Sequence, residues 1–95
     1  MNSFSNRNAR GCEVWVYDKS SRLYNTSQSI CNSLSKALNT PNRGVKFFKS
    51  FTVLKKSKMP ALLVEVDFIS NSIVEDICTS YDYCYVVAKS ICDKL

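Results

Sequence analysis

The segment 61–66, Ala-Leu-Leu-Val-Glu-Val, most constrains what this chain can fold into. Apart from Glu65 it is apolar, and in an extended strand its apolar residues fall on both faces. Such strands are typical of central positions in an α/β sheet, where helices cover both faces. The segment therefore predicts a central strand, a position in which a charged residue such as Glu65 is unexpected.

Glu65 has a structural and a functional interpretation. In the structural one it is an edge-strand residue that meets water, or a buried carboxylate paired with arginine or lysine. In the functional one it lies at the carboxyl end of a central strand, where open α/β sheets bind ligands. Partial shielding by Phe68 and Ile69 would then favour its use as a general base or acid. Periodicity alone favours the structural interpretation.

The rest of the chain predicts alternating strands and helices. We expect a strand over 12–17 and a helix over 21–39, which the turn 18–21 caps. One or two short strands should follow within 42–58, with a turn at Gly44. The chain should end with a helical turn over 73–78 and a helix from Thr79 or Ser80 to the C-terminus. This order indicates one α/β domain over residues 1–95.

The last helix has the clearest pattern. Its apolar residues recur at spacings of three and four, which predicts a packed face. These residues are Tyr81, Cys84, Tyr85, Ala88, Ile91, Cys92 and Leu95. In the helix 21–39 the corresponding stripe is Leu23, Ser27, Ile30, Leu34, Ala37 and Leu38.

The chain is basic, with 13 Lys and Arg against 8 Asp and Glu. A net charge of +5 favours anionic partners. The segment 43–58 holds six basic residues and no acidic one, and Phe47, Phe48 and Phe51 lie among them. Aromatic rings beside basic charge bind single-stranded nucleic acid, so a nucleic-acid-binding module is an alternative function. A solvated basic face is the simpler interpretation because no nucleic-acid motif accompanies the charge.

Histidine is absent from the chain, which removes the commonest general base and the commonest zinc ligand. The five cysteines have no metal-binding spacing, and a reactive cysteine is disfavoured because no histidine would activate it. No segment has the length of a membrane span, and residues 1–10 lack the apolar core of a signal peptide. We therefore expect synthesis in the cytoplasm without a signal peptide.

Several motifs together resemble one family. These are "ARGCEVWVY" at 9–17, "RGVK" at 43–46, "FTVLKKSKMPALLVEVDFISN" at 51–71 and "YCYVVAKSI" at 83–91. They are similar to the motifs of the zinc-dependent N-acetylmuramoyl-L-alanine amidases of type 3, found in bacterial autolysins and phage endolysins. Asp67 departs from the pattern, since the family usually has glycine there.

The resemblance implies that Glu65 is the catalytic glutamate of a hydrolase acting on peptidoglycan in the cell wall. It also implies a zinc ion held by two histidines and a glutamate, none of which matches a residue of this chain. We therefore expect a truncated, partial three-layer α/β domain: the C-terminal portion of the amidase fold, with a small mixed sheet and without the N-terminal strands. Such a chain should bind no zinc and have little activity alone, and its exposed sheet would favour self-association.

Overall fold

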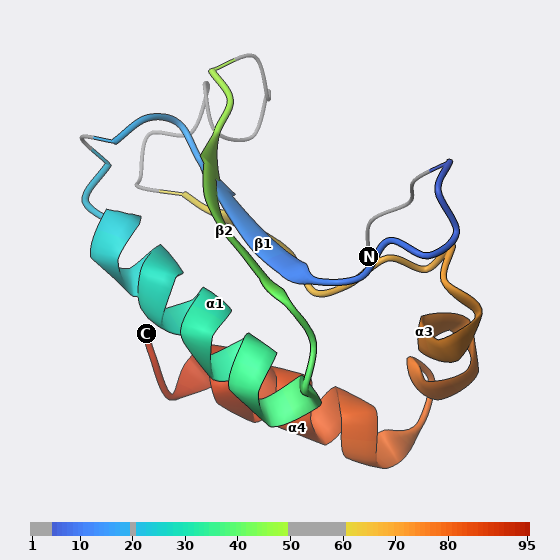
Figure 1. Ribbon diagram of the computed structural model, residues 1–95. Coiled ribbons are helices and arrows are strands. Elements are labelled where there is room, and N and C mark those ends of the chain that lie inside the picture. Colours follow the sequence, from blue (N-terminus) through green and yellow to red (C-terminus); the bar gives the residue numbers. More distant parts are fainter. Residues whose placement is uncertain (1–4, 20, 50–60) are drawn as a thin grey trace.

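A computed structural model of the protein describes residues 5–19, 21–49 and 61–95 (Figure 1). Its elements, in chain order, are β1 (Cys12–Val16), α1 (Tyr24–Leu38), β2 (Asn42–Phe47), β3 (Leu63–Glu65), α3 (Ser72–Ile77) and α4 (Tyr81–Cys92). The predicted order of strands and helices is confirmed. The parts of the predictions that fall on residues 50–60 lie outside the described residues.

The three strands form a mixed sheet in the order β2-β1-β3. β1 and β2 are parallel, with α1 as the connection between them, and β3 is antiparallel to β1. The prediction of a central strand around Glu65 is wrong for the described strands, because β1 takes the centre and β3 lies at an edge. β3 is also short, since only three of its residues pair with β1.

Gly44 lies inside β2, so the expected turn at this residue is wrong. Cys12 pairs with Asn42 and Glu13 pairs with Gly44, which leaves Arg43 as an extra residue in a β-bulge. Gly44 has a φ of 87°, a backbone conformation that glycine adopts at little cost. Gly44 therefore allows the backbone conformation that the bulge in β2 requires.

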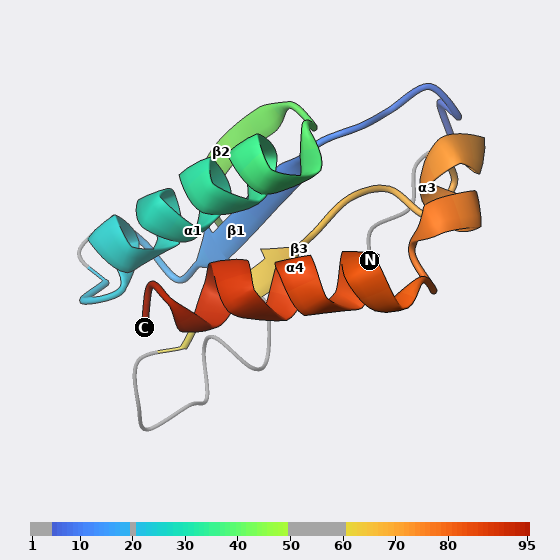
Figure 2. The same cartoon turned by 90° about the horizontal axis from the view of Figure 1, so that it is seen from below.

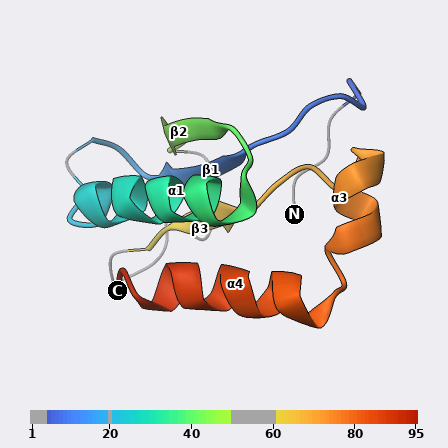
Figure 3. The same ribbon diagram turned by 60° about the horizontal axis from the view of Figure 1, so that its bottom comes forward.

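Helices α1 and α4 lie beside each other over one face of the sheet (Figures 2 and 3). Cys12 and Val14 of β1 are fully buried against Ile30 and Leu34 of α1. Val87 and Ile91 of α4 pack against the same cluster. Helices of the described residues cover this face alone, so the arrangement they show has one sheet layer and one helical layer.

The helix ends follow local sequence signals. α1 begins at Tyr24, later than predicted, and its N-cap is Leu23 without a side-chain hydrogen bond. It ends where Asn39 adopts a left-handed conformation with a φ of 51°. The Ser80 side chain accepts a hydrogen bond from the Tyr83 amide and caps α4 as predicted.

The predicted packed face of α4 is wrong. Ile91 packs inward, but Tyr81, Cys84, Tyr85, Ala88, Cys92 and Leu95 are exposed. Ala37 of α1 is exposed as well, whereas Ser27 is buried. The reason is that α4 has apolar residues on two sides, and a period of three and four does not say which side meets the core.

The described residues include no helix that is both long and apolar enough to cross a membrane.

Candidate functional site

Glu65 is the last residue of β3 and is half-buried. Strand alternation places it on the face of the sheet that α1 and α4 leave open, together with Glu13, Trp15 and Leu63. Its predicted place at the carboxyl end of a strand is confirmed, although the strand is at an edge of the described sheet.

Glu13 is the direct cross-strand partner of Glu65. Residues paired in this way have Cβ atoms about 4.5–5.5 Å apart and point to the same face. Glu13 is only 4% exposed, and its Oε2 lies 3.5 Å from Nε of Arg43. The site therefore contains two neighbouring carboxylates, one of which has a cation in contact.

Arg43 reaches Glu13 because of the bulge in β2 and because Gly11 has no side chain. A Cβ atom on Gly11 would lie 2.7 Å from Cγ of Arg43, a distance that real Cβ contacts do not show. The guanidinium of Arg43 also lies over the Phe68 ring, 4.9 Å from its centroid. Arg43 thus connects β1 with the loop that follows Glu65.

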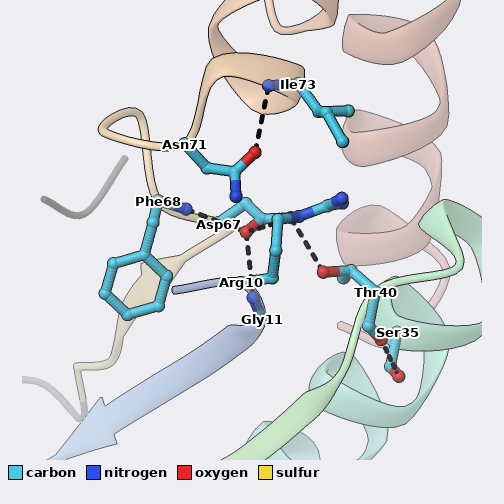
Figure 4. Close-up of polar contacts among 8 residues, drawn as sticks. All are labelled: Arg10, Gly11, Ser35, Thr40, Asp67, Phe68, Asn71 and Ile73. Atoms are coloured by element: carbon cyan, nitrogen blue, oxygen red, sulfur yellow. Dashed lines mark hydrogen bonds and ion pairs between the residues drawn. The ribbon is translucent and has the colours of Figure 1, made fainter. Parts of the chain in front are cut away.

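Asp67 fixes the loop directly after β3 (Figure 4). Its carboxylate is 1% exposed and accepts hydrogen bonds from the side chain of Arg10, at 3.1–3.3 Å, and from the amide of Gly11 at 2.9 Å. The hydroxyl of Thr40 and the amide of Phe68 also donate to it, both at 2.9 Å. We call these five residues, Arg10, Gly11, Thr40, Asp67 and Phe68, the Asp67 junction.

Burial alone would raise the pKa of Asp67. The hydrogen bonds from Gly11, Arg10, Phe68 and Thr40 outweigh burial and hold this pKa below its ordinary value of 3.8. Asp67 is therefore ionised at neutral pH and anchors the segment that carries Glu65.

The described residues do not fit the zinc ion that the resemblance implies. No three His, Cys, Asp or Glu side chains in the described ranges are grouped so that they could hold a metal ion. The chain has no histidine at any position.

A family model described as N-acetylmuramoyl-L-alanine amidase matches residues 1–95. The chain belongs to this family.

Solved amidases share the fold. The structure resembles the N-acetylmuramoyl-L-alanine amidase from Clostridium difficile 630, with a TM-score of 0.88 and 25% identity. It also resembles the N-acetylmuramoyl-L-alanine amidase AmiC2 of Nostoc punctiforme, with a TM-score of 0.84 and 28% identity. Each match covers 99% of this chain and 51% of the other.

Sequence relatives agree with the family. The probable cell wall amidase LytH of Staphylococcus saprophyticus is 30% identical over 94 residues, which are 98% of this chain and 31% of that protein. An uncharacterized 38.4 kDa protein of Clostridium perfringens is 33% identical over 88 residues, which are 90% of this chain and 26% of that protein. This amidase-family chain thus spans about a quarter to a third of these relatives and half of the solved domains.

The aromatic residues near the basic segment contact one another. Phe47 stacks on Tyr24 with ring centroids 5.9 Å apart, and Phe48 meets Trp15 edge-on at 6.0 Å. Lys49 lies over the Tyr17 ring. Phe47 and Phe48 each remain 44% exposed despite these contacts. The alternative of a nucleic-acid-binding module therefore stays a prediction for the described part of the amidase-family chain. Phe51, Lys55, Lys56 and Lys58 lie outside the described residues.

The cysteines occupy two environments. Cys12 and Cys31 are buried, and the Cys12 thiol donates to the carbonyl oxygen of Cys31. The hydrogen bond with Cys12 and burial raise the pKa of Cys31, so its thiol stays protonated at neutral pH. The prediction that Cys84 and Cys92 are packed is wrong, because both are exposed.

Sequence reasoning singled out Glu65 but missed Glu13, Arg43 and the role of Asp67. For Glu13, the signal in the sequence is a charged residue inside the apolar strand 12–17, the same signal that identified Glu65. The pairing of the two strands, which brings the two carboxylates together, is not visible in one sequence.

Proposed function

We propose that this chain is the C-terminal portion of an amidase catalytic domain that acts on peptidoglycan, and that Glu65 is its catalytic carboxylate. The observation that carries the proposal is the place of Glu65, at the end of β3 on the face of the sheet opposite α1 and α4. Membership of the amidase family supports the reaction class.

The proposed reaction is hydrolysis of the amide that joins the lactyl group of N-acetylmuramic acid to L-alanine of the stem peptide. Glu65 would accept a proton from the attacking water and return it to the departing amine. Arg43 would hold the side chain of the neighbouring Glu13 in place, and the Asp67 junction would fix the backbone that follows Glu65. Because the described residues do not form a zinc site and the chain has no histidine, we propose little or no hydrolysis by this chain alone.

The proposed partner is the peptidoglycan of a bacterial cell wall, and the wall is the proposed place of action. Synthesis in the cytoplasm without a signal peptide stays a prediction. Self-association through the exposed sheet is also proposed, because the outer strands of a sheet, β2 and β3 among the described residues, can offer backbone groups to another chain.

A chimera tests the role of Glu65. The part of the Clostridium difficile amidase that this chain does not cover is joined to residues 1–95, and release of L-alanine amino groups from purified peptidoglycan is measured. We expect the chimera to be active and Glu65→Gln to lower its rate about 100-fold or more, the usual contribution of a general acid or base. Glu75→Gln, an exposed change in the first turn of α3, is the matched control.

Zinc-dependent hydrolysis by the 95-residue chain alone would contradict the proposal, and so would full activity of the Glu65→Gln chimera. If the chimera does not fold, residues 61–72 are instead transplanted into the Clostridium difficile amidase, and the same substitution is measured there.

A further inference from the structure

Helix α4 has a second apolar side that the described molecule does not cover. Val87 and Ile91 pack against the core on the inner side. On the outer side, Tyr81 is 80% exposed, Tyr85 is 57% exposed and Leu95, just past the helix, is 78% exposed. Ala88 and Cys92 are exposed between them. Figure 3 shows α4 along one margin of the molecule, with no other described element beyond it. We call Tyr81, Tyr85, Ala88, Cys92 and Leu95 the outer seam.

The spacing of the outer seam is 4-3-4-3, which is the heptad spacing of a coiled-coil contact. A single surface helix needs one apolar stripe toward its core, and α4 already has that stripe. The rings of Tyr81 and Tyr85 are stacked on each other, with centroids 6.4 Å apart and planes at 17°. The seam thus presents an ordered aromatic surface, which loses little side-chain freedom when it is covered.

The outer seam has large side chains in one half and small side chains in the other. Tyrosines stand in the N-terminal half, and Ala88 and Cys92 stand in the C-terminal half. Two copies of α4 side by side in antiparallel orientation would place Tyr85 against Ala88 and Tyr81 against Cys92. Large side chains would then meet small ones, as close packing requires. A parallel pair would instead place tyrosine against tyrosine and alanine against alanine.

The charges beside the seam favour the same orientation. Asp82 lies in the first turn of α4, and Lys89 lies in its last turn. Antiparallel pairing brings Asp82 of each copy near Lys89 of the other, a contact that a parallel pair does not make. Lys89 also contacts Asp93 of its own chain at 3.3 Å, in an exposed pair of the kind that contributes little to stability. The two helix dipoles are also opposed in the antiparallel pair.

We propose that α4 pairs with α4 of a second copy of this chain, antiparallel and about a two-fold axis between Tyr85 and Ala88. The outer seam is the centre of this interface. An isologous contact of this kind closes on itself and gives a dimer. The inference does not depend on the chemistry of Glu65.

Sedimentation velocity over a concentration series tests the dimer. We expect the wild-type chain to shift from monomer to dimer as its concentration rises. Tyr85→Glu should raise the dimer dissociation constant about 30-fold or more, since it places a charge at the centre of an apolar contact. Ile73→Glu is the matched control, because Ile73 of α3 is 58% exposed and lies outside the seam. Circular dichroism verifies that each variant is folded.

A charge exchange tests the orientation. Asp82→Lys and Lys89→Asp should each weaken the dimer about tenfold, and the double variant should restore it, because opposite charges face each other again. Failure of the double variant to restore the dimer overturns the antiparallel arrangement.

A chain that stays monomeric at every concentration overturns the proposal and leaves the seam as a contact for a different partner, such as the rest of an amidase domain. Val66→Lys places a charge beside the edge strand β3. If this change abolishes the dimer while Tyr85→Glu does not, the interface is the sheet edge, and the proposal for α4 is overturned.

Discussion

Glu65 and Asp67 are two carboxylates only two positions apart, and the fold treats them differently. Asp67 is fully buried and accepts hydrogen bonds from four residues on three separate segments of the chain. Glu65 lies on the face of the sheet opposite α1 and α4, beside Glu13; it is half-buried and its Oε2 is buried. Asp67 is held as a structural anchor, whereas Glu65 keeps part of its surface exposed. A charge inside an apolar strand thus identifies a candidate for function only once its surroundings are known.

The largest expected change in stability follows from removing the carboxylate of Asp67. Asp67→Ala should lower the free energy of unfolding by about 3 kcal/mol, because it leaves Arg10 and the buried donors of the junction without their acceptor. Urea denaturation measures the change. Asp76→Ala, an exposed substitution in α3, is the control and should change stability by less than about 0.5 kcal/mol. If Glu65→Gln lowered the free energy of unfolding as much as Asp67→Ala, the contrast between the two carboxylates would be wrong.

The same anchor predicts a pH dependence. The pKa of Asp67 is lowered in the folded state, so its contribution is fully present above the ordinary value of 3.8. It is lost as the pH falls through that value toward the lower folded pKa. Urea midpoints measured across this range should fall with pH more steeply for the wild-type chain than for Asp67→Asn. Parallel curves would show that Asp67 titrates normally.

A smaller effect on stability is expected where Arg43 contacts Glu13. Arg43→Met should lower the free energy of unfolding by about 1–2 kcal/mol, because the buried Glu13 loses a cation. We place the effect below that of a fully buried pair because the Arg43 side chain is 41% exposed. A double-mutant cycle with Glu13→Gln measures the coupling between the two side chains. Additive single effects would show that the contact contributes nothing.

The smallest effect concerns Tyr83, whose hydroxyl is buried without a hydrogen-bond partner among the described residues. Burial and then the charge of Asp67 raise the pKa of Tyr83 to about 12. Tyr83→Phe should leave stability unchanged or raise it by up to about 1 kcal/mol, since a buried polar group without a partner costs free energy. Tyr17→Phe, which removes an exposed hydroxyl outside the outer seam, is the control. A loss of more than about 1 kcal/mol in Tyr83→Phe would mean that the hydroxyl has a partner in solution.

The sequence predicted which segments form helices and strands better than it predicted which elements pack against one another. The 3.6-residue period located α4, but apolar residues on both of its sides hid which side meets the core. The apolar segment 61–66 predicted a strand with Glu65 at its carboxyl end, but its place beside β1 in the described sheet depends on long-range pairing. Gly44 indicated an irregular backbone, and the structure places the irregularity inside β2 rather than in a turn.

The candidate site was also predictable only where the signal is local. Glu65 was identified because it is one charged residue in an apolar strand. Glu13, Arg43 and Asp67 enter the site through contacts between distant segments, such as the one that needs Gly11 to have no side chain. Contacts of this kind are set by the tertiary fold and leave no period or motif in a single sequence.

The Asp67 junction also bears on how this chain folds. Its hydrogen bonds join residues that are 57, 56 and 27 positions apart in the sequence. Such contacts close long loops, and the entropy of closure must be overcome before they form. We therefore predict that the junction assembles after the local helices. Interactions formed after the folding transition state mainly slow unfolding, so substitutions in a late-forming junction should shorten the lifetime of the folded chain more than they slow its folding.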